Sequence, residues 1–161
     1  MNQFSKIIPV ISAMLASPAV AQAPASSPLL GAWAVDVARL PVPPEARPKS
    51  VTMTFSDAGA GKWRTDVDIL AGDGSERRMF STYAPDGTPA PIIGDQMEAD
   101  RSAVKLPEPG VMVLALTKGG TPASTRIYAV GPDAKTMVET AVYFDDKGNP
   151  IMRTNYFNRV R

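Results

Sequence analysis

The stretch that decides the fold is VTMTFSDAGAGKWRTDVDIL, residues 51–70. In its first half, Val51, Met53 and Phe55 alternate with hydroxyl side chains, and in its second half mostly apolar residues alternate with charged ones. Alternation with a period of two is typical of a strand with one buried face and one wet face. The Gly-rich segment 58–61 between the halves predicts a tight turn. The stretch therefore predicts a β-hairpin.

The same pattern continues on both sides of this hairpin. Turns containing Gly, Pro, Asn or Asp separate further segments that have the composition of strands. These segments are residues 31–37, 75–83, 99–106, 111–118, 124–130, 136–145 and 150–160. Two Pro-rich segments, residues 41–48 and 84–95, interrupt the pattern, and at most a short helical turn is expected after Pro43. The sequence thus predicts an all-β fold, an antiparallel meander of about eight to nine strands that closes into a small barrel, because closure removes exposed strand edges.

Residues 1–23 have the order of a secretory signal peptide. Basic Lys6 precedes a short apolar run, and Ala21-Gln22-Ala23 provides the cleavage site. The apolar run is too short to span a bilayer, so we expect no membrane span. We expect residues 24–29 to be a flexible mature N-terminus and residues 30–161 to form the barrel domain. The expected location is the periplasm or the outside of the cell.

The composition excludes several classes of site. The sequence contains no Cys and no His, which removes disulfides, thiolate zinc sites and His-dependent catalytic triads. Its 17 basic and 16 acidic residues nearly balance, so nothing indicates nucleic-acid binding. We expect no enzymatic activity, no cofactor and no metal.

Acidic residues gather in one loop, where Asp95, Glu98 and Asp100 lie close together in the sequence. Hard cations take oxygen ligands from such loops, but this spacing matches no standard calcium loop. We therefore favour carboxylates that are solvated or paired with basic residues over a metal site.

Apolar and amphipathic side chains are the remaining candidates for a binding site. Met adapts to irregular shapes, and Tyr combines an apolar ring with a polar hydroxyl. The candidates on the predicted strands are Met53, Phe55, Val67, Tyr83, Met112, Leu114, Tyr128, Tyr143 and Tyr156. Such residues line a cavity for a small ligand or fill a solid core, and the sequence leaves both alternatives open.

Several short motifs follow one another along the mature chain. They are Gly31-Ala32-Trp33 at its start, Tyr83-Ala84-Pro85-Asp86-Gly87 at mid-chain, Lys118-Gly119-Gly120 between later strands and Tyr156-Phe157-Asn158-Arg159 at its end. In this order they resemble a family of small, secreted lipocalin-like (calycin-type) proteins of Gram-negative bacteria that has no established activity. The resemblance covers nearly all of residues 30–161, and it implies a lipocalin-like barrel without implying a chemical reaction.

The resemblance also implies a structural signature. Calycin barrels typically place a basic residue of the last strand across the Trp of the first strand. Here Gly31 and Trp33 open the first strand, and Arg159 lies near the end of the last. We therefore expect Arg159 to stack on Trp33, with Arg161 as the alternative.

Two functions remain after these exclusions. The first is an exported lipocalin-like barrel that binds a small hydrophobic or amphipathic molecule. The alternative is a non-enzymatic structural or interaction protein of the cell envelope, with a solid core and a protein partner that the sequence does not identify. An internal cavity would favour the first function, whereas a filled interior with an exposed apolar patch would favour the second.

Overall fold

The structure is a computed structural model that describes residues 27–160. The expected signal peptide and its cleavage site lie outside the described residues. Within residues 27–160, no helix is long and apolar enough to cross a membrane.

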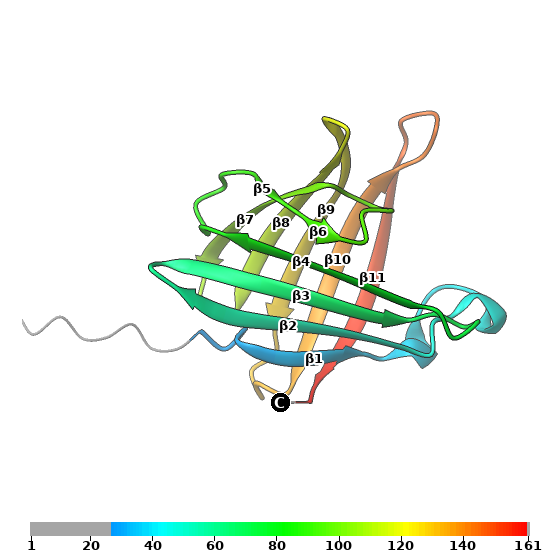
Figure 1. Cartoon of the computed structure of the whole chain (residues 1–161). Helices are drawn as coiled ribbons and strands as arrows, with labels where there is room; N and C mark the ends of the chain where they lie inside the picture. The colour runs from blue at the N-terminus through cyan, green and yellow to red at the C-terminus, as the bar shows by residue number, and fades with distance from the viewer. Residues whose placement is uncertain (1–26, 161) are drawn as a thin grey trace, which may run out of the picture.

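Strands dominate the described part, and they form one antiparallel sheet in the order β5-β7-β8-β9-β10-β11-β1-β2-β3-β4-β6 (Figure 1). The longer strands are β1 (Gly31–Val35), β2 (Ser50–Gly59), β3 (Lys62–Leu70), β4 (Glu76–Tyr83), β7 (Arg101–Glu108), β8 (Val111–Lys118), β9 (Thr121–Val130), β10 (Thr136–Phe144) and β11 (Pro150–Arg159). These strands coincide, apart from their ends, with the segments that the sequence predicts. The all-β antiparallel fold is therefore confirmed.

The predicted number of strands is too low. The sheet has 11 strands, because the Pro-rich segment 84–95 contains the two-residue strands β5 (Ala90–Pro91) and β6 (Ile93–Gly94). β5 pairs with β7, and β6 pairs with β4, so this segment covers both edges of the sheet. Proline supplies no N–H and breaks the alternation of side chains. The sequence pattern therefore shows no strand in this segment.

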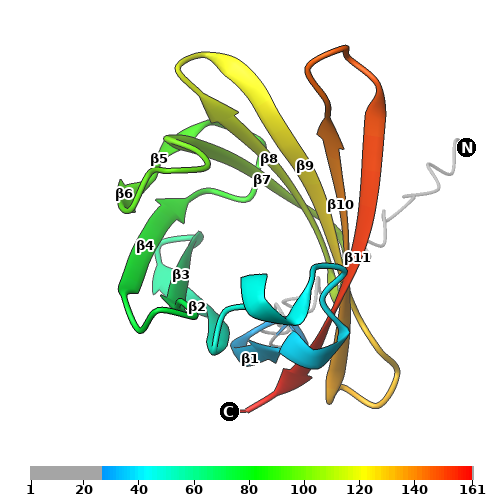
Figure 2. The same ribbon diagram turned by 90° about the vertical axis from the view of Figure 1, so that its right-hand side faces the viewer.

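The sheet curls into a nearly closed barrel, whose seam lies between β4 and β7 (Figure 2). At this seam the hydroxyl of Ser102 donates to the hydroxyl of Ser81 at 2.9 Å, and Ser81 donates to the carbonyl of Pro91 at 2.9 Å. Gly94 has a φ of 95°, and a Cβ at this position would clash with the carbonyl of Arg78 on β4. The hydrogen bond between Ser81 and Ser102 thus bridges β4 and β7, and the absence of a side chain at Gly94 lets β6 lie close against β4.

One end of the barrel is packed solid. Trp33 and Tyr128 are fully buried, and the rings of Tyr128 and Phe55 meet edge to face with 5.9 Å between their centres. Leu29 is also fully buried, and its carbonyl accepts a hydrogen bond of 2.8 Å from the indole of Trp33. The packed domain thus includes Leu29, a residue that the sequence analysis places in the segment 24–29 before the barrel.

Arg159 closes this packed end over Trp33. The two residues are partners in the register between β1 and β11, and the guanidinium carbon lies 4.0 Å from the centre of the indole ring. Arg159 also donates hydrogen bonds of 2.7 Å to the carbonyls of Leu30 and Ala134, and another to the carbonyl of Pro28. The contact expected between Trp33 and Arg159 is present.

A strap, residues 36–49, crosses the opposite end of the barrel (Figure 2). It contains the 3-10 helices η1 (Val37–Arg39) and η2 (Pro44–Ala46). On one side, the guanidinium of Arg39 lies 3.3 Å from the centre of the Tyr156 ring on β11. On the other side, the backbone N–H of Lys49 donates to the carbonyl of Leu70 at 2.8 Å. The short helical turn expected after Pro43 is η2, whereas the sequence analysis did not predict η1.

Candidate ligand-binding cavity

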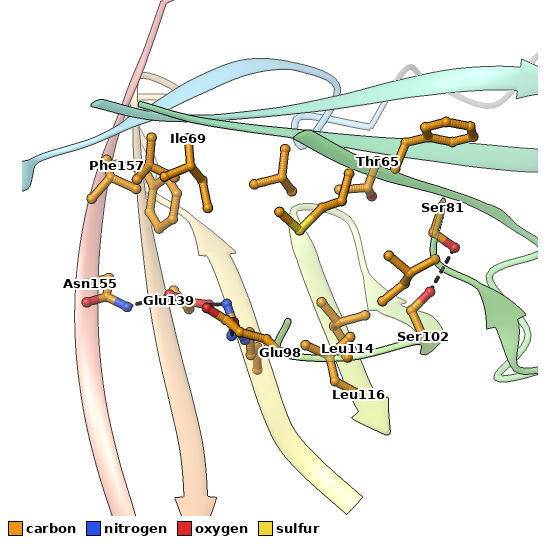
Figure 3. A pocket seen from close by; sticks show the side chains of 18 of the residues that line it. Thr65, Ile69, Ser81, Glu98, Ser102, Leu114, Leu116, Glu139, Asn155 and Phe157 are labelled. Atoms are coloured by element: carbon orange, nitrogen blue, oxygen red, sulfur yellow. Dashed lines mark hydrogen bonds and ion pairs between the residues drawn. The ribbon is translucent and has the colours of Figure 1, made fainter. Parts of the chain in front are cut away.

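A cavity of about 230 Å³ lies between the packed end and the strap (Figure 3). Phe157 of the packed end and Leu40 of the strap both line it. One water molecule requires only about 10–15 Å³, whereas pockets for small molecules begin near 300 Å³. The cavity is therefore much larger than a water site but slightly smaller than a typical ligand pocket, so it suits a compact molecule or the end of a longer chain.

One wall of the cavity is apolar. Its aliphatic side chains are Val67 and Ile69 on β3, Met79 on β4, and Leu114 and Leu116 on β8. On β3 the alternation that predicts the hairpin sends Val67 inward, while Arg64 and Asp66 point outward and form an ion pair of 2.6 Å. The pattern of the deciding stretch thus builds one side of the cavity directly.

Tyr83 adds a hydroxyl to this wall. Its phenol oxygen lies 2.7 Å from the hydroxyl of Thr65. Burial raises the pKa of Tyr83 to about 12, although the hydrogen bond to Thr65 opposes the change. The phenol therefore stays protonated and neutral at physiological pH.

The opposite wall carries a buried polar cluster. Glu139 on β10 is 2% exposed, and its carboxylate accepts hydrogen bonds from the hydroxyl of Tyr128 at 2.8 Å and from the amide of Asn155 at 2.6 Å. The guanidinium of Arg126 on β9 lies 3.4 Å from the same carboxylate. Within residues 27–160, no buried side-chain nitrogen or oxygen lacks a hydrogen-bond partner. The cluster is therefore fully satisfied, which a buried polar network requires.

The charges in this cluster support one another. Burial works against the charge of Arg126, but the negative charges of Glu139 and Glu98 hold the pKa of Arg126 above its ordinary value. Burial, assisted by the charge of Glu139, raises the pKa of Tyr128 well above its ordinary value. Arg126 therefore remains a cation, and Tyr128 remains a protonated donor to the carboxylate.

The three carboxylates of the acidic loop separate in the structure. Asp95 pairs with Arg77 at 2.6 Å, Glu98 pairs with Arg126 at 2.8 Å, and Asp100 accepts a hydrogen bond from a backbone N–H on the β8–β9 turn. Residues 27–160 contain no group of three or more potential metal-ligating side chains. Of the three, only Glu98 lines the cavity.

The nine candidate ligand-binding residues fall into three groups. Those that line the cavity are Val67, Tyr83 and Leu114. Those that lie in the packed core without lining the cavity are Met53, Phe55, Met112 and Tyr128. The remaining two are Tyr143, which lies beside Arg126 and Arg153, and Tyr156, which packs under the strap.

Sequence reasoning missed the polar members of the cavity. They are Ser81, Glu98, Ser102, Arg126, Glu139 and Asn155. A lone charge in an apolar strand is normally assigned to the wet face. A signal was nevertheless present, because Glu139 is spaced by two from Met137 and Ala141, and both of these are buried. That spacing places Glu139 on the inner face.

The outer face of β8, β9, β10 and β11 differs in charge from the outer face of the β2–β3 hairpin. The charged residues within these four strands are Lys118, Arg126, Glu139, Arg153 and Arg159. Apart from Lys118, which follows a β-bulge at the end of β8, they share the register of the inward-facing residues, so up to that bulge the outward rows of these strands carry no charge. The exposed large apolar residues on these outward rows are Ile127, Val138, Phe144 and Met152.

Comparison with family models, with curated proteins and with solved structures found no match. The cavity and its residues therefore carry the functional argument.

Proposed function

We propose that the chain is an exported, lipocalin-like barrel that binds a small amphipathic molecule in its cavity. The observation that carries this proposal is the division of the cavity into an apolar wall on β3, β4 and β8 and a polar cluster on β9, β10 and β11. An amphipathic ligand would place its apolar part against Val67 and Leu114. Its polar end would face Arg126.

The expected affinity is modest. Burial of about 200 Å² of apolar ligand surface yields about 5 kcal/mol before the costs of association. A hydrogen bond to a charged group adds about 1.5–3 kcal/mol. Because the costs of association reduce this sum, we expect binding no tighter than micromolar, which suits a protein that must also release its ligand.

The arrangement of the carboxylates supports binding rather than catalysis. Glu98 and Glu139 are the carboxylates that line the cavity, and both are paired with Arg126. A general acid or base must be within reach of a reacting group. Because Arg126 and its neighbours already engage both carboxylates, we propose no chemical step and no cofactor.

Export is part of the proposal. The signal peptide predicted in residues 1–23 would direct the chain to the periplasm or out of the cell, where an apolar compound needs shielding from water. N-terminal sequencing of the exported protein should begin at Pro24. An exported protein that retains Met1 would contradict this part of the proposal.

Titration with an apolar fluorescent dye tests the binding function. The wild-type mature chain should bind the dye saturably. Leu114→Trp should abolish binding because the larger side chain fills the cavity, whereas Ala115→Trp, the neighbouring outward position on β8, should leave binding unchanged. Equal binding by the wild type and both variants would place the dye elsewhere, and the absence of saturable binding would refute the function.

The interaction protein remains the alternative, and the uncharged outer face of β8–β11 is the observation that favours it. The most suitable partner is a second copy of this chain, because two uncharged faces meet without like-charge repulsion. Under this alternative, sedimentation equilibrium should detect a dimer that Ile127→Lys dissociates. A wild-type chain that stays monomeric at high concentration would eliminate this alternative.

A further inference from the structure

We propose that Glu98 stands in the place of a ligand carboxylate, so that the cavity selects amphiphiles with an anionic carboxylate headgroup. The inference rests on the proposed function and adds the headgroup chemistry to it. The juxtaposition that carries it is a single guanidinium, Arg126, held between two carboxylates of opposite character, Glu139 and Glu98 (Figure 3).

Glu139 is the fixed partner of Arg126. Its side chain is 3% exposed, and the donors of Tyr128 and Asn155 hold its two oxygens. Removal of this carboxylate from the cluster would leave those donors buried without an acceptor, which is costly. A ligand therefore cannot displace Glu139.

Glu98 is the displaceable partner. Its side chain is 57% exposed, and it follows Met97, which is 72% exposed. Within residues 27–160, its one hydrogen bond to a side chain is the 2.8 Å contact with Arg126. Arg126 is only 17% exposed, but it keeps Glu139 as a partner when Glu98 moves away into water, so Glu98 can leave Arg126 at modest cost.

The position that Glu98 would vacate fits a carboxylate better than other headgroups. Nη2 of Arg126 donates a charge-assisted hydrogen bond to the carboxylate at this position, and a ligand carboxylate would restore the charge that Glu98 withdraws. An ammonium group at this position would face the cationic Arg126. A hydroxyl group would offer Arg126 an uncharged acceptor, which gives a weaker hydrogen bond and leaves the charge that Glu98 balanced without a partner.

The test compares decanoate, decan-1-ol and decylamine, which share one apolar tail, by calorimetric titration of the mature chain. We expect decanoate to bind more tightly than decan-1-ol. Glu98→Gln should tighten decanoate binding about two- to five-fold, because it removes a competing carboxylate whose own side chain is mostly exposed, and should change decan-1-ol binding less. Glu76→Gln, an exposed ion-paired Glu on β4, is the matched control and should change neither affinity.

Four results would overturn the inference. If Glu98→Gln weakens decanoate binding or leaves it unchanged, Glu98 does not compete with the ligand. If decylamine binds most tightly and Glu98→Gln weakens decylamine binding, the site selects cationic headgroups and Glu98 is a ligand contact. If none of the three compounds binds, the proposed function fails together with the inference, whereas decan-1-ol binding without a decanoate preference removes the inference alone.

Discussion

The two walls of the barrel distribute their charges in opposite ways. On β3 and β4, charged side chains such as Arg64, Asp66 and Arg78 point outward, and the inward rows are largely apolar, with Arg77 near the start of β4 as the charged exception. On β8 to β11 the outward rows are uncharged, while Arg126 and Glu139 point inward. The first wall follows the ordinary pattern of a half-buried sheet. The second wall inverts it.

The two walls differ in the desolvation cost of their charges. A charge on the outer face of the first wall is solvated and needs no partner. A charge inside the second wall is stable only because a complete set of partners surrounds it. Such a cluster contributes little net stability compared with apolar packing, which agrees with the proposal that it recognises a polar ligand group.

The largest expected change in stability comes from a comparison of one carboxylate from each wall. Glu139→Gln removes the anion of the buried cluster and should lower the free energy of unfolding by about 3 kcal/mol. Asp66→Asn, which loosens the exposed pair with Arg64, should lower it by less than about 1 kcal/mol. Urea denaturation of the two variants measures both quantities. Similar losses in the two variants would remove the distinction between the walls.

The second effect concerns Arg159, the inward charge at the packed end of the second wall. Its contact with Trp33 should contribute about 1–2 kcal/mol, because the guanidinium is partly shielded from water above the indole. A double-mutant cycle with Trp33→Phe and Arg159→Met measures the coupling between the two side chains. Additive losses in the double variant would show that the contact contributes nothing.

The third effect lies at the seam between the walls and depends on pH. The hydrogen bond from Arg77, followed by that from the backbone N–H of Met97, lowers the pKa of Asp95 from 3.8 to about 2. A lowered carboxyl pKa stabilises the fold above the ordinary pKa, and that stabilisation is lost as pH falls through the folded-state value. Asp95→Asn should therefore destabilise the protein at pH 7, and its difference from the wild type should disappear between about pH 4 and pH 2. A difference that does not change with pH would contradict the ion pair.

The smallest effect tests the outer face of the first wall. Arg78 bridges Asp68 and Glu76, and its side chain is 71% exposed. Arg78→Gln should cost at most about 0.5 kcal/mol at low ionic strength, and high salt should screen this cost. Thermal unfolding in low and high NaCl measures the change. A larger loss that persists in high salt would mean that these outer charges are not simply solvated.

The sequence predicted those elements in which polar and apolar side chains alternate locally between solvent and core. The β2–β3 hairpin and the strands after the seam belong to this group, whereas the approach of Arg159 to Trp33 was implied by the family resemblance. β5 and β6 were not predictable, because each consists of two residues fixed by pairing with a distant edge rather than by local alternation. Nor was the cavity, since the same strand pattern describes a filled barrel and a hollow one.

The polar cluster escaped prediction for a different reason. The inward position of Glu139 depends on Tyr128 and Asn155, which come from neighbouring strands and satisfy its oxygens. Local sequence does not contain these long-range partners. The spacing of Glu139 from two buried residues indicates its face, but only once the register is known.

The central claim, that the cavity holds a small amphipathic molecule, is tested most directly by native mass spectrometry of the protein recovered from the cells that make it. We predict a mass in excess of the mature chain for the wild type and for Ala115→Trp, and no excess mass for Leu114→Trp. Denaturation should release a compound with an apolar tail and a polar end. A wild-type protein that carries no excess mass and that also binds no apolar probe would contradict the claim.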